Sequence, residues 1–363
     1  MPEPREPMRT RRSLPTRLGE GAARRRSFKV DAESLVCRGD PVTATSLPAV
    51  FVATRPDVRL AEWLGARRDA VHDLLHAQGA VLFRGFPLRR ASALEQVMQA
   101  SSGAEAESYD YRSTPRSRVE GRVYTSTDYP ADQTIPQHSE QAYSRAFPRA
   151  LGFLCLAPSR VGGATPIADN RRVLGRIPKP VRDRFERHGV LYVRNYGGPL
   201  DLGWREVFQV DERAAVEAYC AAEGIDVAWG ADDRLRTRQV CQAVFAHPVT
   251  GEAVWFNQAH LFHVSALGAA DRETLLATCG GEQQLPRQAY YGNGDPIPDA
   301  ELEVVRAAIA AETVRFDWQA GDLLLVDNLL ASHGREPFDG ERRVVVCMTG
   351  AASWRPHAAG DEA

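Results

Sequence analysis

The 363-residue sequence lacks several features that would assign it to particular classes of protein. It contains no run of about 18 apolar residues, the length that a membrane-spanning helix needs, so we expect no membrane association. Its net charge at pH 7 is only -2, which predicts no broad basic surface and disfavours nucleic acid as a partner. Lys29 and Lys179 are the only lysines among its 45 basic residues, an imbalance typical of a GC-rich genome rather than of a function.

The six cysteines form no CxxC pair, and several of them lie inside apolar runs, as buried free thiols do. This pattern fits a reducing cytoplasm better than secretion. Arg11 and Arg12 lie near the start of the sequence, but no apolar segment follows them. We therefore expect neither a secretory nor a twin-arginine signal, and the predicted location is the cytoplasm.

Hydrophobic patterning separates a polar tail from a folded domain. Residues 1–27 are rich in Arg, Pro and Glu, which predicts a disordered tail. Many short strands without a regular βαβ alternation predict a mainly β fold with flanking helices (α+β), built as an antiparallel sandwich or barrel. Strands are predicted at 79–85, 151–156, 166–168, 190–193, 240–245, 253–256, 313–316, 323–326 and 344–348. Helices are predicted from about residue 60 and at 91–101, 178–188, 211–222, 271–279 and 299–311.

The segment Ile135–Glu140 contains the first candidate metal ligands. Residues two positions apart in a strand point to the same face, so His138 and Glu140 would present an imidazole and a carboxylate side by side. Both groups are suitable ligands for iron(II). Two unrelated surface residues also match an HxE pattern easily, so the motif alone is weak.

A third candidate ligand follows a predicted strand near the end of the chain. The apolar run Leu323–Val326 ends in the polar pair Asp327-Asn328, and His333 lies just beyond it. Two histidines and one carboxylate leave three positions open on one side of an iron ion, as in the facial triad of non-haem oxygenases. Taken alone, His333 is equally well explained as an ordinary histidine at the edge of an apolar run.

Two arginines and a threonine are suited to hold a small dianion. Arg342 and Arg343 precede the strand predicted at 344–348, and an arginine buried there needs an anionic partner because an unpaired buried charge is costly. A dicarboxylate would supply that partner in bidentate geometry, and a carboxylate of the protein is the alternative. Thr165 offers a hydroxyl donor after a Gly-Gly pair, which is also ordinary hairpin-turn chemistry.

Five of these residues, in this order, resemble the site of the taurine dioxygenase-like (TauD/TfdA) family of Fe(II)/2-oxoglutarate oxygenases. They are His138, Glu140, Thr165, His333 and Arg343. The resemblance covers most of residues 80–350 and is greatest to the clavaminate synthase-like and SyrP-like branch, which uses Glu where other members use Asp. It implies a double-stranded β-helix, or jelly-roll, core in a single domain over residues 28–356, with an insertion at about 190–300.

The resemblance also implies the cofactors. The two histidines and the glutamate would hold Fe(II), with 2-oxoglutarate and O2 as cosubstrates. Arg343 and Thr165 would bind the far carboxylate of 2-oxoglutarate. Arg342 is the weaker candidate, because the anchor of the family matches the second arginine of the pair.

Two positions narrow the chemistry within the family. In the taurine enzyme a further arginine, four residues after the anchor, binds the substrate sulfonate. Here the matching residue is Cys347, which we expect on the same face as Arg343 because the two share strand parity, so a small sulfonate is disfavoured. Halogenases of the superfamily lack the carboxylate ligand, so Glu140 favours oxygenation, with desaturation and cyclisation as other reactions of such a site.

The implied substrate is a small amino acid or a derivative of one, free or tethered to a carrier protein, which the enzyme hydroxylates at an unactivated C–H bond in natural-product (antibiotic) biosynthesis. The candidate substrate contacts are Tyr143, Arg194, Asn257 and Gln258. Two other functions remain open: a mononuclear metal dioxygenase of cupin type, which needs no dicarboxylate anchor, and a non-catalytic jelly-roll binding protein. The sequence does not give an oligomeric state.

Overall fold

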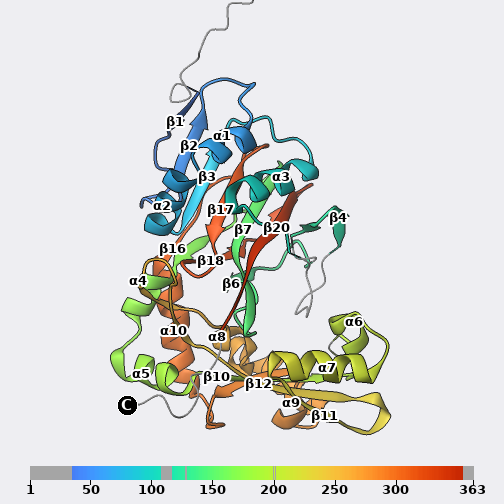
Figure 1. Ribbon diagram of the computed structural model, residues 1–363. Helices are drawn as coiled ribbons and strands as arrows, with labels where there is room; N and C mark the ends of the chain where they lie inside the picture. The colour runs from blue at the N-terminus through green and yellow to red at the C-terminus, as the bar shows by residue number, and fades with distance from the viewer. Residues whose placement is uncertain (1–34, 108–116, 127–128, 199, 201, 355–363) are drawn as a thin grey trace, which may run out of the picture. The chain divides into compact units, whose positions relative to one another are not determined.

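A computed structural model describes residues 35–107, 117–126, 129–198, 200 and 202–354, and the tail predicted at 1–27 lies outside these residues. The largest sheet has eight strands in the order β1-β2-β3-β17-β7-β20-β5-β4 (Figure 1). Its strands are β1 (Val36–Arg38), β2 (Ala49–Ala53), β3 (Ala80–Arg84), β4 (Arg118–Glu120), β5 (Val123–Thr125), β7 (Ala146–Ala157), β17 (Leu323–Asp327) and β20 (Arg343–Ser353). All neighbouring pairs are antiparallel except β2 and β3.

A second sheet of four strands, in the order β16-β9-β18-β6, packs against one face of the first. Its strands are β6 (Ile135–His138), β9 (Ile167–Asp169), β16 (Thr313–Val314) and β18 (Ala331–Arg335). Ile167 and Ala331 of this sheet share one apolar core with Phe153, Leu324 and Val346 of the larger sheet. Two mainly antiparallel sheets that enclose a common core form the jelly roll that the family resemblance implied.

Three helices cover the other face of the large sheet (Figure 1). They are α1 (Leu60–Ala66), α2 (Arg68–Gln78) and α3 (Ala91–Ser102). Their apolar sides pack on the sheet through residues such as Leu75 and Leu94, both of which are buried. The helix predicted from residue 60 is divided into α1 and α2, and α2 ends at Gln78 with Gly79 as its C-cap, whose φ of +84° suits a glycine.

Residues 190–291 contribute a separate four-stranded sheet with its own apolar core. The sheet order is β11-β12-β10-β15, with β10 (Val190–Tyr196), β11 (Asp226–Trp229), β12 (Leu235–Cys241) and β15 (Arg287–Tyr291). The sequence predicted one strand at 240–245, but the structure ends β12 at Cys241 and begins β13 at Val244. It missed most of β12 because two of the buried positions of that strand hold the polar residues Thr237 and Gln239, and two arginines alternate with them.

The remaining elements connect these sheets. The helices are α4 (Asn170–Arg176), α5 (Lys179–His188), α6 (Trp204–Phe208), α7 (Arg213–Glu223), α8 (Ala259–Phe262), α9 (Ala269–Cys279) and α10 (Asp299–Glu312). The short strands are β8 (Val161–Gly162), β13 (Val244–Ala246), β14 (Ala253–Trp255) and β19 (Phe338–Asp339). Within the described ranges no helix is both long and apolar enough to cross a membrane. A single domain over 28–356 stays a prediction.

Candidate metal and cosubstrate site

The three candidate metal ligands meet at the end of the four-stranded sheet. Strands β6 and β18 are antiparallel neighbours, and their register pairs His138 directly with His333. The centroids of the two imidazole rings are 4.4 Å apart. One ligand atom from each of His138, Glu140 and His333 lies within 4.8 Å of the other two. This is the donor set, two imidazoles and one carboxylate, of a facial iron(II) site.

Glu140 reaches this site from a turn, so the strand argument made for it from the sequence was wrong. Strand β6 ends at His138, two residues earlier. Gln141 then adopts a left-handed conformation with φ of 55°, which reverses the chain just after the glutamate. Glu140 is nevertheless buried, because only 3% of its surface is exposed.

The hydrogen bond of His138 prepares its ring for a metal. Its Nδ1 lies 2.8 Å from the carbonyl oxygen of Pro136, an acceptor, so Nδ1 carries the hydrogen and Nε2 carries the lone pair. Metal-binding histidines usually donate their second N–H to a carbonyl or carboxylate in this way. The donor chemistry of the site therefore fits a divalent metal.

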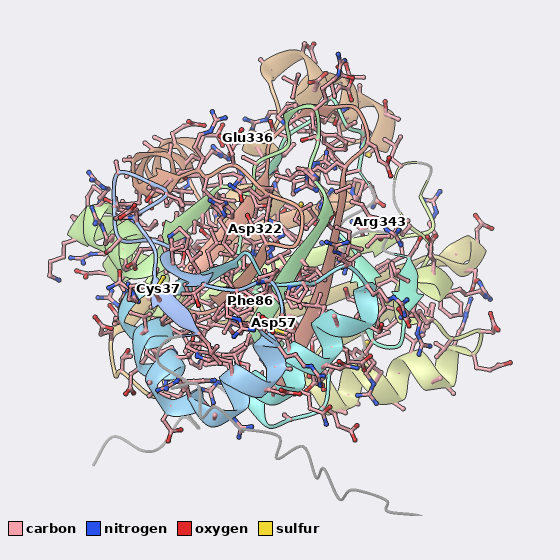
Figure 2. The ribbon with its side chains drawn as sticks, turned by 90° about the horizontal axis from the view of Figure 1, so that it is seen from above. Cys37, Asp57, Phe86, Asp322, Glu336 and Arg343 are labelled. Carbon is pink, nitrogen blue, oxygen red and sulfur yellow. The ribbon has the colours of Figure 1, made fainter. Side chains whose placement is uncertain are left out.

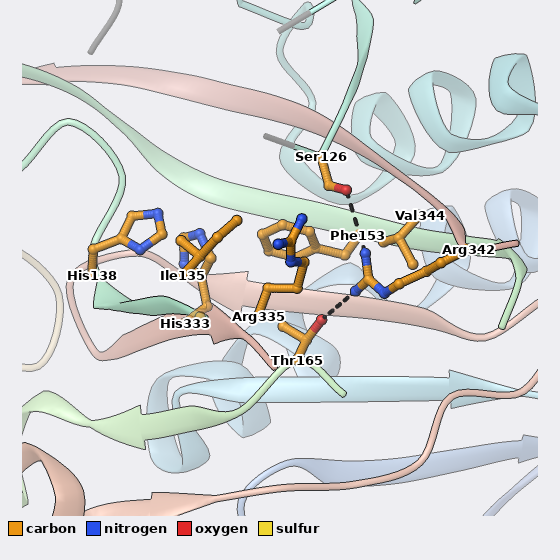
Figure 3. A pocket seen from close by; sticks show the side chains of 10 residues that line it. Ser126, Ile135, His138, Phe153, Thr165, His333, Arg335, Arg342 and Val344 are labelled. Carbon is orange, nitrogen blue, oxygen red and sulfur yellow. Dashed lines mark hydrogen bonds between the residues drawn. The ribbon is translucent and has the colours of Figure 1, made fainter. Parts of the chain in front are cut away.

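A small cavity beside the histidines is lined by two arginines and two hydroxyl groups (Figure 3). Arg342 donates to the carbonyl of Gly163 at 2.9 Å, to Thr165 Oγ1 at 3.3 Å and, in a long contact, to Ser126 Oγ at 3.5 Å. Arg335 donates to backbone carbonyls, including that of Tyr129 at 3.0 Å, and its Nε is buried with no partner among the described residues. All these acceptors are neutral.

The arginines are therefore suited to bind an anion. In the part of the chain that the structure describes, no carboxylate forms an ion pair with either Arg342 or Arg335. Burial, followed by the nearby charge of Arg335, lowers the pKa of Arg342 to about 10. Burial also lowers the pKa of Arg335. An anion bound between these side chains would offset that unfavourable burial of positive charge.

The sequence favoured Arg343 over Arg342 as the cosubstrate anchor, but the structure favours Arg342. Arg342 lines the cavity, whereas Arg343, the exposed first residue of β20, does not (Figures 2 and 3). Cys347 packs in the core between the large sheet and the helices that cover it. The register of β20 shifts between Arg343 and Val344, so strand parity does not relate Cys347 to Arg343 as the sequence predicted. Val344 and Val346 face the four-stranded sheet instead. Since both faces of β20 are apolar, its sequence could not show which face meets the site.

The two cavities next to the ligands differ greatly in size. The space between Arg335, Arg342 and His333 is about 30 Å³, which is enough for only a few water molecules. A dicarboxylate would enter it only if the arginine side chains moved. A neighbouring cavity of about 520 Å³ begins at His138 and Glu140, which is within the usual range for a small-molecule site.

The large cavity is mainly apolar and is lined by the 258–287 segment. Phe262 and Leu267 contribute apolar walls, and Arg287 contributes a guanidinium group. Among the predicted substrate contacts, only Gln258 lines this cavity, and its side-chain amide donates to the carbonyl of Ser139 at 2.7 Å.

The other three predicted substrate contacts line neither cavity. Tyr143 is buried against Phe262, with ring centroids 5.2 Å apart. The guanidinium of Arg194 lies over the ring of Tyr196 at 4.9 Å. Asn257 bonds to the carbonyl of Ala243 and to the amide of Ala259, both at 3.0 Å. Sequence alone could not separate these three buried polar side chains from residues that line a cavity. The cavity residues that it missed include Ser126, Arg335 and Arg287.

A second cluster with suitable ligand atoms comprises His76, His247 and Asp327. The Nδ1 atom of His247 accepts hydrogen bonds from the amides of Val249 at 3.3 Å and Thr250 at 3.1 Å. It therefore carries no hydrogen, and Nε2–H donates to Asp327 Oδ2 at 3.1 Å. A metal at Nε2 would force the hydrogen onto Nδ1, against two N–H groups. This cluster is a hydrogen-bonded support rather than a metal centre.

Comparison with known proteins agrees with this geometry. The family model described as "Taurine catabolism dioxygenase TauD, TfdA family" matches residues 41–348. The chain belongs to the TauD/TfdA family of dioxygenases. As a member of this family it is an Fe(II)- and 2-oxoglutarate-dependent dioxygenase that uses O2, which confirms the prediction of the enzyme class and of the cofactors.

Two similar proteins cover most of this TauD/TfdA-family chain. The dapdiamide synthesis protein DdaC of Enterobacter agglomerans is 41% identical over 314 residues, which are 85% of this chain and 94% of DdaC. A clavaminate synthase-like protein of Arabidopsis thaliana is 33% identical over 322 residues, 85% of this chain and 89% of that protein.

Solved structures share the fold. The PvcB protein of Pseudomonas aeruginosa has a TM-score of 0.52 at 14% identity and covers 89% of this chain and 93% of its own. The complex of AAD-2 with Mn(II) and N-oxalylglycine has a TM-score of 0.50 at 10% identity, covering 89% of this chain and 99% of its own. At these identities the likeness concerns the fold alone.

Proposed function

We propose that His138, Glu140 and His333 hold the iron, and that Arg342 with Thr165 binds the far carboxylate of 2-oxoglutarate. One observation carries this proposal: the cluster of two imidazoles and a carboxylate lies beside the buried Arg335 and the half-buried Arg342, which have no carboxylate partner in the described chain. A cupin-type dioxygenase without 2-oxoglutarate would have no use for those arginines. A non-catalytic binding protein would not need the preset ring of His138.

Iron(II) bound there would supply the activation of O2, with 2-oxoglutarate as the co-oxidised partner that yields succinate and carbon dioxide. The residues of the chain would bind and orient the iron and the cosubstrate. The carbonyl of Pro136 fixes the ring of His138, and Phe153 packs beside His333 with ring centroids 4.9 Å apart. The guanidinium of Arg342 would fix one end of the cosubstrate, and the apolar walls of the large cavity would exclude water from the reacting carbon.

For the substrate, we propose an amino acid or a derivative of one, hydroxylated at an unactivated C–H bond in natural-product biosynthesis. The similarity to a dapdiamide synthesis protein supports a biosynthetic role. The large cavity supports a small molecule that has an apolar body, since Leu261, Phe262 and Leu267 line it. Arg287 in the same cavity suits a carboxylate of such a substrate, whether free or tethered to a carrier protein.

Anaerobic spectroscopy tests the site directly. Addition of Fe(II) and 2-oxoglutarate to the purified chain should produce a visible charge-transfer band that requires both components. The band should disappear in His333→Ala and, at moderate 2-oxoglutarate, in Arg342→Met, but persist in Arg343→Met. Absence of the band in the folded wild-type chain, or its persistence in His333→Ala, would show that the assignment is wrong.

A further inference from the structure

Glu140 lies beyond the end of β6, so no ladder of strand hydrogen bonds fixes its backbone. Hydrogen bonds from the side chain of the buried Asn328 fix it instead. The amide of Glu140 donates to Asn328 Oδ1 at 2.7 Å, and Asn328 Nδ2 donates back to the carbonyl of Glu140 at 2.9 Å. A carboxamide has the same donor and acceptor as a peptide group, so Asn328 makes the paired bonds that a neighbouring strand would make.

Asn328 is itself held firmly. Its side chain donates a further bond to the carbonyl of Pro148 at 2.8 Å, and its backbone amide donates to the carbonyl of Arg149 at 2.9 Å. None of its surface is exposed. The preceding Asp327 accepts the amides of Leu329 at 3.0 Å and Leu330 at 3.1 Å, which shapes the turn that presents the carboxamide.

Two other buried carboxamides hold the residue before the glutamate. Gln258 donates to the carbonyl of Ser139 at 2.7 Å, and Asn170 donates to Ser139 Oγ at 3.0 Å. The three amides come from the end of β17, the start of α8 and the start of α4, so separate parts of the chain converge on two residues. Asn328 is the member that contacts the glutamate itself.

We propose that Asn328 is a positioning residue: its carboxamide fixes the backbone of Glu140 and so determines how well this carboxylate binds the metal. The inference rests on the proposed assignment of Glu140 as a metal ligand. Replacement of groups that orient a metal ligand typically weakens metal binding about 10- to 100-fold. A buried asparagine with a purely structural role would instead lower the stability of the fold and leave the metal affinity of the folded chain unchanged.

Asn257 provides a matched control. It is also buried, and its carboxamide bonds to two backbone groups, one fewer than that of Asn328; these groups belong to Ala243 and Ala259, neither of which lies in the ligand segment. Asn328→Ala and Asn257→Ala should therefore both lose stability in urea unfolding with a chelator present. Only the first should lose metal affinity.

The test uses Mn(II) and Co(II) as probes with the full-length chain. Electron paramagnetic resonance measures free Mn(II) and so gives the affinity of each variant for the metal. This affinity should be lowered 10- to 100-fold in Asn328→Ala and should stay within about 3-fold of wild type in Asn257→Ala. The visible Co(II) spectrum should change only in Asn328→Ala. If that variant does not fold, the nearly isosteric Asn328→Asp, which keeps the acceptor for the Glu140 amide but not the two donated bonds, should show the same direction.

The outcomes separate the two proposals. Wild-type affinity and an unchanged Co(II) spectrum in a folded Asn328 variant would overturn the positioning role alone. Equal loss of metal affinity in Asn257→Ala and Asn328→Ala would also overturn it, because the effect would then be a general one of core disruption. Tight Mn(II) binding that survives Glu140→Ala would instead remove the metal-site assignment and the inference with it.

Discussion

Replacement of Arg342 by methionine should separate cosubstrate binding from stability. The guanidinium lies in a cavity with no carboxylate partner among the described residues, and burial lowers its pKa to about 10 from 12.5. That shift corresponds to roughly 3 kcal/mol against the charged form. The hydrogen bonds of Arg342 to three neutral acceptors, one of them long, stabilise the folded chain by about 2 kcal/mol. The free energy of unfolding without ligands should therefore stay the same or rise by about 1 kcal/mol.

The same substitution should strongly weaken 2-oxoglutarate binding. Removal of one partner of a buried charge pair costs about 2–5 kcal/mol, and a central value near 3 kcal/mol corresponds to about a 100-fold higher Kd. The exposed Arg343 is the matched control, since Arg343→Met removes an equal charge from the adjacent position. Its Kd should stay within about 3-fold of wild type, because rim charges contribute little.

Titration calorimetry of 2-oxoglutarate into the Mn(II)-loaded chain measures both Kd values, and urea unfolding measures stability. If Arg343→Met weakens binding and Arg342→Met does not, the anchor is the second arginine and the placement of the cavity is wrong. If Arg342→Met lowers stability by several kcal/mol, the arginine has an anionic partner in the protein and is not kept for a cosubstrate.

Three further predictions concern the surroundings of the site. Burial lowers the pKa of His260 from 6.5 to about 4, so between these pH values only the unfolded chain binds the proton and stability falls as the pH falls. The wild-type chain should lose about 2 kcal/mol of stability from this group between pH 8 and pH 5. Urea unfolding should show that His260→Gln abolishes this loss. His247→Phe should lower stability by about 1–3 kcal/mol because Asp327 loses its partner. Equilibrium dialysis should give one Mn(II) per chain in both wild type and variant. A drop from two bound Mn(II) ions to one would instead reveal a second metal centre. In Gly334→Ala the new Cβ would lie 2.7 Å from the carbonyl oxygen of Ile135, which should push β18 from β6 and weaken Mn(II) binding with a stability loss of about 1–3 kcal/mol, whereas Gly175→Ala, with no atom within 4 Å, should leave both intact.

Much of the fold follows from apolar spacing. Buried strands such as β7 and β17 have continuous apolar runs, and α3 and α10 have a clear helical period, so both kinds of element could be predicted. Strand β15 could not, because its residues Arg287–Tyr291 mix charged, polar and aromatic types. Its pairing with β10 depends on distant residues, which local patterns do not describe.

The site was predictable to the extent that side-chain chemistry limits the choice. Two histidines and a glutamate at these positions predict a metal, and an arginine pair before a buried strand predicts an anion. Which arginine faces inward could not be deduced, because Val344–Met348 is apolar on both faces and parity then gives no direction. The glutamate was predicted to lie near His138 for the wrong reason, since a turn held by distant amides, not a strand, brings it there.

The two halves of the proposed site belong to different sheets, which links the core to the chemistry. His138 and His333 stand on the four-stranded sheet, whereas Arg342 directly precedes β20 of the eight-stranded sheet. The distance from the metal ligands to the dicarboxylate anchor is therefore set by the apolar layer between the sheets. Phe153 belongs to this layer and also contacts His333. Because such a core is close-packed, a change of one methylene group there would alter the geometry of the site as well as the stability of the fold.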